Sequence, residues 1–88
     1  MPEFVIEKEM PGLGDLEPDE LKLTARRSCS ALHGIAEGIE WVQSYLTDGK
    51  VYCVYRAPSA DAIREQIARL GLPPVVSICE IRNVIGPA

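Results

Sequence analysis

Residues that build metal centres and covalent cross-links are scarce in this 88-residue sequence. It has one histidine and three cysteines, and the cysteines lie too far apart to form a C-x-x-C pair. A zinc knuckle or an iron–sulfur cluster is therefore not expected. An odd number of cysteines in a protein without a secretory leader favours reduced thiols over disulfide bonds.

Positive charge is also scarce. Nine Lys and Arg residues stand against thirteen Asp and Glu residues, which gives a net charge of -4. Binding to nucleic acids or to anionic membranes is driven by positive charge, so we expect neither partner. The apolar stretches are short, and the first residues have neither a basic start nor an apolar run, so we predict no transmembrane segment and no signal peptide. The sequence thus favours a cytoplasmic protein.

The composition that remains is typical of one small globular domain, here residues 1–88, with 47% hydrophobic and 25% charged residues. A chain of this length buries only about 60–65% of the surface that its unfolded form exposes. Without disulfide bonds, such a domain gains stability by pairing with a second copy.

Hydrophobic periodicity predicts four strands and two helices. Pro18 suits the first turn of a helix, Ser59 is a good N-cap, and Gly71 is a good helix end. The expected strands cover residues 2–10, 39–46, 50–56 and 75–84, and the expected helices cover residues 18–37 and 60–70. The order βαββαβ is that of an α+β, ferredoxin-like domain, in which an antiparallel sheet carries both helices on one face.

A two-residue turn at Asp48–Gly49 predicts how the central hairpin pairs. Counting back from this turn sets Tyr45 opposite Tyr52 and Trp41 opposite Arg56, and residues that oppose each other share a face. The more apolar face, expected under the helices, carries Val42, Ser44, Leu46, Val51, Cys53 and Tyr55. The opposite face carries Trp41, Gln43, Tyr45, Tyr52, Val54 and Arg56.

Three large aromatic rings among amide and guanidinium groups are costly to leave in water and too polar for a dry core. Such a face is typical of a sheet-to-sheet interface that encloses a ligand cavity. We therefore predict a homodimer, arranged as a dimeric α/β barrel, with a pocket for a small molecule or a metal ion on the aromatic face.

Carboxylates are expected beside the aromatic residues. Glu7 and Glu9 alternate onto the aromatic face, and Glu80 joins them if the last strand pairs with the first. Carboxylates there could bind a cation or act as a base, whereas salt bridges at the rim are the competing interpretation. The predicted ligand-binding residues are Glu7, Glu9, Trp41, Gln43, Tyr45, Tyr52 and Glu80.

The remaining motifs favour structural roles. His33 has Cys29 and Glu37 at i−4 and i+4, a spacing that could hold a metal ion, but its place at the edge of the apolar stripe favours a solvated or interface histidine. Cys29 and Cys53 fall on core-facing positions, so we predict burial for both. Residues 12–14 lack the rest of a phosphate-binding motif and indicate a turn. We assign no catalytic residues.

A resemblance spans nearly the whole chain. It rests on residues 7–12, 28–29, 41–45, 47–50, 52–55, 57–58, 63–65 and 71–73. These segments resemble a family of small bacterial domains of unknown function that are often labelled nickel-binding proteins. The resemblance implies a dimeric ferredoxin-like fold and makes nickel a possible cofactor.

This chain departs from the family pattern at two positions. Many members have histidine where this chain has Gln43 and Gln66. Glutamine is a poorer ligand for nickel than imidazole, so the resemblance implies a metal site that is lost or has changed a ligand.

Three functions stay open. The leading interpretation is a binding domain for a small molecule or metal ion. A cofactor-independent enzyme of the isomerase or monooxygenase type, using the dimer cavity, is the alternative from another class, and it rests on analogy between folds. The third is a structural or regulatory interaction module.

Overall fold

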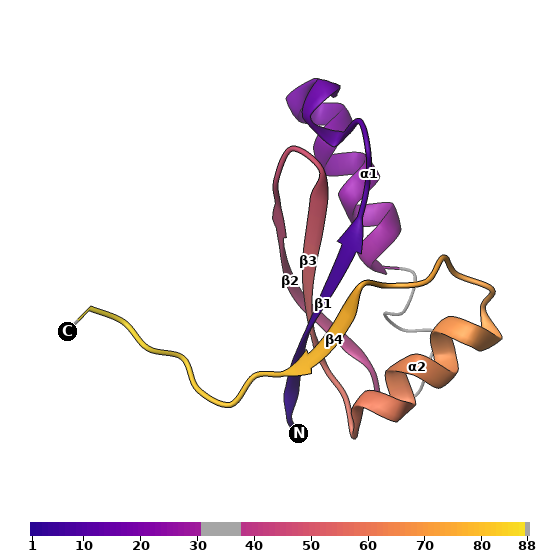
Figure 1. Cartoon of the computed structure of the whole chain (residues 1–88), viewed down its shortest axis with the longest axis vertical. Coiled ribbons are helices and arrows are strands. Elements are labelled where there is room, and N and C mark those ends of the chain that lie inside the picture. The colour runs from indigo at the N-terminus through magenta and orange to yellow at the C-terminus, as the bar shows by residue number, and fades with distance from the viewer. Residues whose placement is uncertain (31–37, 88) are drawn as a thin grey trace.

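Four antiparallel strands form one sheet with two helices beside it (Figure 1). The computed structural model describes residues 1–30 and 38–87. The elements are β1 (Glu3–Glu9), the 3-10 turn η1 (Leu13–Asp15), α1 (Pro18–Ser30), β2 (Glu40–Leu46), β3 (Lys50–Arg56), α2 (Ala60–Arg69) and β4 (Ser77–Glu80). The strand order is β2-β3-β1-β4. The α+β class is confirmed, and the arrangement is consistent with a ferredoxin-like fold.

The predicted ends of α2 are confirmed because local residues set them. The Ser59 hydroxyl accepts a hydrogen bond from the Ala62 amide at 3.1 Å, which caps the first turn. Gly71 follows the helix with φ 66°, a backbone conformation that favours glycine. Helix α1 begins at Pro18 as predicted, with acidic residues in its first turn. Its predicted end, together with His33 and Glu37, lies outside the described residues.

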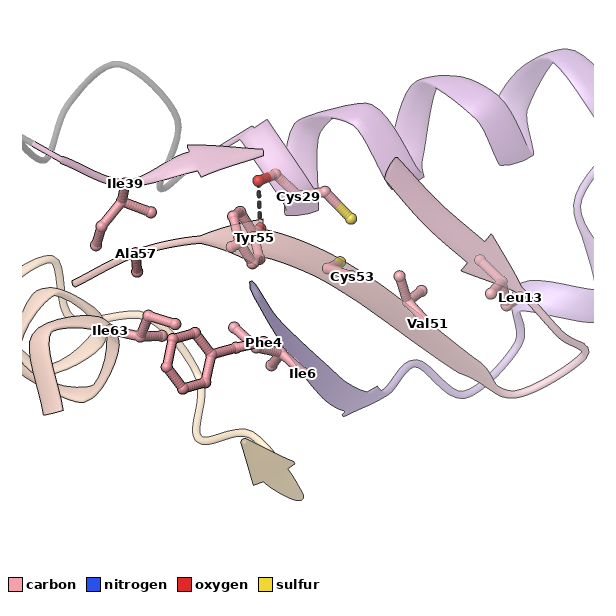
Figure 2. Packing of buried hydrophobic residues seen from close by; sticks show 10 residues of the cluster. All are labelled: Phe4, Ile6, Leu13, Cys29, Ile39, Val51, Cys53, Tyr55, Ala57 and Ile63. Atoms are coloured by element: carbon pink, nitrogen blue, oxygen red, sulfur yellow. Dashed lines mark hydrogen bonds between the residues drawn. The ribbon is translucent and has the colours of Figure 1, made fainter. Parts of the chain in front are cut away.

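The hydrophobic core lies between the helices and one face of the sheet (Figure 2). Cys29 of α1 and Ile63 of α2 are buried in the same cluster as Phe4 and Ile6 of β1, so both helices pack against this face. We call it the helix face. The buried cluster consists of Phe4, Ile6, Leu13, Cys29, Ile39, Val51, Cys53, Tyr55, Ala57 and Ile63.

The glycine-flanked segment after β1 is a turn, as the sequence predicts. Gly12 has φ 84°, and the backbone then forms η1, which inserts Leu13 into the core. The Gly14 amide donates to the Asp48 carbonyl at 2.8 Å, and a Cβ at Gly14 would stand 3.1 Å from the Asp48 Cβ. The lack of a side chain thus allows η1 to lie against the β2–β3 turn.

The hairpin register is confirmed near the turn and wrong at its far end. Tyr45 pairs with Tyr52 and Gln43 pairs with Val54, as predicted, but an irregularity between Trp41 and Gln43 sets Trp41 opposite Tyr55 instead of Arg56. One extra residue in a strand reverses the alternation of the side chains beyond it.

Trp41 therefore lies on the helix face, where it packs against the core and its indole Nε1 donates to the Ser44 Oγ at 2.9 Å. The extra residue, Val42, is exposed instead of lying under the helices.

Strand β4 is shorter than predicted. The expected strand covered residues 75–84, whereas the observed one covers Ser77–Glu80. Its neighbour β1 begins at Glu3, and the Ile81 amide donates to the Glu3 carbonyl at 2.8 Å at the end of this pairing. Residues 82–87 then extend away from both helices (Figure 1). In the described part of the chain, no helix is long and apolar enough to cross a bilayer.

Candidate functional site: the open face of the sheet

The second face of the sheet, which we call the open face, carries two rows of side chains across all four strands. Opposed residues share a face, so the register assigns each row. One row runs through Tyr45, Tyr52, Glu7 and Ser77, and the next through Gln43, Val54, Val5 and Cys79. The row of Glu3, Arg56 and Glu40 lies at one end, and Lys50 and Glu9 lie at the other.

Polar contacts hold several of these side chains in place. The Gln43 Nε2 donates to the Tyr45 hydroxyl at 2.5 Å, although the Tyr45 ring is still 55% exposed. The Lys50 Nζ lies 2.8 Å from a Glu7 carboxylate oxygen. The hydrogen bond to Glu7 and its negative charge raise the pKa of Lys50 above its usual value. These contacts orient an amide, a phenol and a carboxylate toward the same side of the sheet.

An ion-pair cluster closes one end of the open face. The Arg56 Nε lies 3.0 Å from the Glu3 carboxylate, and its Nη1 lies 3.7 Å from that of Glu40. These side chains are partly exposed, so their main effect is on the charge of the rim and much less on stability.

Five of the seven predicted ligand-binding residues lie on the open face, and two do not. Trp41 is on the helix face because of the irregularity at Val42. Glu80 pairs with Phe4, a core residue, so its register position is also on the helix face, against our prediction. The residues that the structure brings together are Glu7, Glu9, Gln43, Tyr45 and Tyr52.

Cys79 lies on the open face but was not among the ligand-binding residues predicted from the sequence. It pairs with Val5 on the open face, and its thiol is exposed. Glu7 pairs with Ser77, two residues before Cys79, so Glu7 and Cys79 are diagonal neighbours on adjacent strands. The sequence has no tight turn from which the register of β4 can be counted, because a loop with two prolines leads into it.

The other two cysteines are buried on the helix face, as predicted. Ser44 pairs with Cys53, and its hydroxyl donates to the Cys29 sulfur at 3.0 Å. The Tyr55 hydroxyl donates to the Cys29 carbonyl (Figure 2). Both thiols are completely buried, which favours a structural role.

The two buried thiols also interact with each other. The hydrogen bond to Cys53 and burial raise the pKa of Cys29, and the same hydrogen bond lowers the pKa of Cys53 although burial opposes it. Because the Cys53 thiol is completely buried, lack of access limits its reactivity.

A comparison with protein families adds to this geometry. A family model described as nickel responsive protein SCO4226-like matches residues 4–81. The chain belongs to this family. No curated protein and no solved structure matches the chain. The resemblance predicted from the sequence is confirmed. The SCO4226-like match covers all described strands and helices except the first residue of β1, and it ends where β4 stops pairing with β1.

Nickel does not fit the described residues of a single SCO4226-like chain. Residues 1–30 and 38–87 contain no group of three or more His, Cys, Asp or Glu side chains that could hold a metal ion. The histidine, His33, lies outside these residues. Gln43 is on the open face, whereas Gln66 is in α2, which packs against the helix face. The two glutamines at which the sequence departs from the expected family pattern are therefore on different sides of the sheet.

Two cavities of about 190 and 420 Å³ lie beside α2 and the loop that leads to β4. Ile67 and Leu72 contribute to both, and the charged residues Lys8, Glu9 and Arg27 line the smaller one. Neither cavity is lined by Gln43, Tyr45 or Tyr52. The pocket predicted on the aromatic face thus needs a second surface over the open face.

Proposed function

We propose that this SCO4226-like chain is a metal-responsive binding domain of the cytoplasm and works as a homodimer. The open faces of two ferredoxin-like copies meet and enclose the binding pocket, as in a dimeric α/β barrel. The observation that carries the proposal is the open face itself: in the described part of the chain no helix covers it, and it holds two tyrosines and an oriented amide.

The composition of the open face supports an interface. Tyrosine is enriched at protein interfaces because its ring is apolar and its hydroxyl stays satisfied by hydrogen bonds. Tyr45 is exposed and already bonded to Gln43, so a second copy would bury the ring without breaking that bond. Val5, which lies in the next row, is partly exposed and adds apolar surface, whereas its neighbour Val54 is already buried.

The described residues of one copy offer too few donors for nickel, and two copies double their number. Glu7 and Cys79 offer a carboxylate and a thiol on neighbouring strands of the open face. A two-fold axis through the interface would bring the same residues from both copies into one pocket. Gln43 offers an amide where many relatives have imidazole, so we expect this chain to bind nickel more weakly than they do.

Sedimentation equilibrium of the whole chain tests the homodimer. We expect a dimer at micromolar concentration that Tyr45→Asp dissociates, because a carboxylate would be buried between the two faces. Leu23→Asp is the matched control, since Leu23 is similarly exposed, at 51%, but lies on α1. A monomeric parent chain contradicts the proposal.

Titration calorimetry with Ni²⁺ tests the metal site. Gln43→His should strengthen nickel binding by on the order of tenfold or more, because imidazole replaces an amide oxygen on the open face. Gln66→His, on the other side of the sheet, is the comparison and should have little effect. A stronger response to Gln66→His would place the site beside α2 instead.

A further inference from the structure

The segment after β4 has the sequence of a strand and no strand beside it. Residues 81–85, Ile-Arg-Asn-Val-Ile, are rich in β-branched side chains, which favour strands. The backbone is not in a helix or a strand after Glu80, and Val84 and Ile85 are each 85% exposed. Two neighbouring apolar side chains are thus almost fully in water.

The cause lies in the register of the sheet. β4 pairs with β1, which begins at Glu3, so the strand beyond Ile81 extends past the end of its neighbour. In the residues that the structure describes, the pairing with β1 stops at Ile81. It leaves the sheet away from both helices, in the direction where no helix covers the molecule (Figure 1).

The alternation of side chains limits what can cover this segment. Consecutive residues of an extended chain point to opposite sides, so Val84 and Ile85 cannot both be buried against one flat surface. A seam between two molecules offers two surfaces. Two copies that stack on their open faces create such a seam at the rim.

Charge also favours the open face as the receiving surface. That face carries the carboxylates Glu3, Glu7, Glu9 and Glu40 against the cations Lys50 and Arg56, so two stacked copies would bring excess negative charge together. The Arg82 side chain is 86% exposed, and its Nε is 3.9 Å from the Glu80 carboxylate, a weak contact. It can supply positive charge to the rim of a partner.

We propose that residues 82–87 form an arm that binds a second copy of this chain, with Val84 and Ile85 buried in the seam and Arg82 at its acidic rim. This inference rests on the homodimer proposed above and adds a segment that stabilises it. The exchange is reciprocal, because each copy of a two-fold dimer gives one arm and receives one.

The test is the dimer dissociation constant of the full chain, measured by sedimentation equilibrium. The double variant Val84→Asn with Ile85→Asn should raise this constant at least ~100-fold, because each of two arms loses two buried apolar side chains. Arg82→Gln should raise it less and make it less sensitive to salt. Leu23→Asn, an exposed leucine of α1, is the control and should leave it unchanged.

The outcomes separate the arm from the dimer. A parent chain that is monomeric overturns both proposals, whereas a dimeric parent whose constant is unchanged in the arm variant overturns the arm alone. Cross-linking gives a second measurement. The variant Ile85→Cys is made in a Cys79→Ser background, and isotope-labelled and unlabelled copies are mixed. Cross-links from residue 85 should then join labelled to unlabelled copies. Cross-links found only within one copy also overturn the arm.

Discussion

The same strands form both faces of the sheet, but the two faces differ in burial and in the polarity of their side chains. The helix face buries Ile6, Cys53 and Tyr55 completely, and its hydroxyl, thiol and indole groups bond to one another. The open face alternates with it residue by residue and carries tyrosines, carboxylates and an exposed thiol. The first face gives the chain its stability. The second keeps polar groups available, so it is where binding is expected.

Neighbouring residues of β1 give the largest expected contrast between the two faces. Ile6→Ala should lower the free energy of unfolding by about 2–5 kcal/mol, because Ile6 is fully buried and its loss leaves a cavity. Val5→Ala, on the open face, should cost about 1 kcal/mol or less in the monomer.

Urea denaturation at low protein concentration measures both variants. Equal losses in the free energy of unfolding for Ile6→Ala and Val5→Ala would contradict the proposed contrast between the two faces. If a second copy covers the open face, the cost of Val5→Ala should rise with protein concentration, while that of Ile6→Ala should not change by more than experimental error.

Thiol labelling gives the next contrast. In native protein, Cys79 should react with a water-soluble alkylating agent at least ~100-fold faster than Cys29 and Cys53, which react only after local opening. All three should react quickly in denaturant, which is the control. Fast labelling of Cys53 in folded protein would mean that its lowered pKa is used for chemistry, and the enzyme hypothesis would then become the leading one.

Removal of a single hydroxyl from each face should have a smaller effect. Tyr55→Phe should cost about 1–2 kcal/mol, because the buried Cys29 carbonyl loses the hydrogen bond that Tyr55 donates. Tyr45→Phe should cost less than about 0.5 kcal/mol, since its hydroxyl only accepts a bond from Gln43 at the surface. Thermal unfolding of both variants measures the difference, and a larger loss for Tyr45→Phe would reverse our assignment of the faces.

The smallest expected effect is electrostatic. Glu7 raises the pKa of Lys50 in the folded chain. The ion pair therefore stabilises the fold fully at pH values below the pKa of an unfolded lysine, about 10.4. This stabilisation is lost as the pH rises through the higher pKa that Lys50 has in the folded chain. Urea midpoints between pH 8 and 12 should therefore fall more for the parent chain than for Lys50→Met. Salt should reduce the difference, because the pair is exposed. If the advantage of the parent chain over Lys50→Met in urea midpoint grew with pH, the stabilising Lys50–Glu7 ion pair would be contradicted.

Features set by neighbouring residues could be predicted from the sequence. The cap at Ser59, the stop at Gly71 and the hairpin pairing of Tyr45 with Tyr52 all depend on a few adjacent residues, and all are confirmed.

Features set by contacts between distant segments could not be predicted. Val42 has the side chain of a regular strand residue, and only the packing of Trp41 against the core explains the irregularity beside it. The register of β4 depends on its pairing with β1, so the sequence analysis chose Glu80 for the open face where the structure has Cys79.

The irregularity at Val42 makes β2 sensitive to parity. Val42 is the residue without a partner on β3, so its deletion would place Trp41 directly before Gln43 and leave the indole opposite Tyr55, on the core side. A regular strand that kept Val42 would instead set Trp41 opposite Arg56, so the indole would leave the core and become exposed. Deletion of Val42 should thus be tolerated better than deletion of another residue of β2, and a sequence alignment that treats β2 as a regular strand would assign Trp41 to the wrong face.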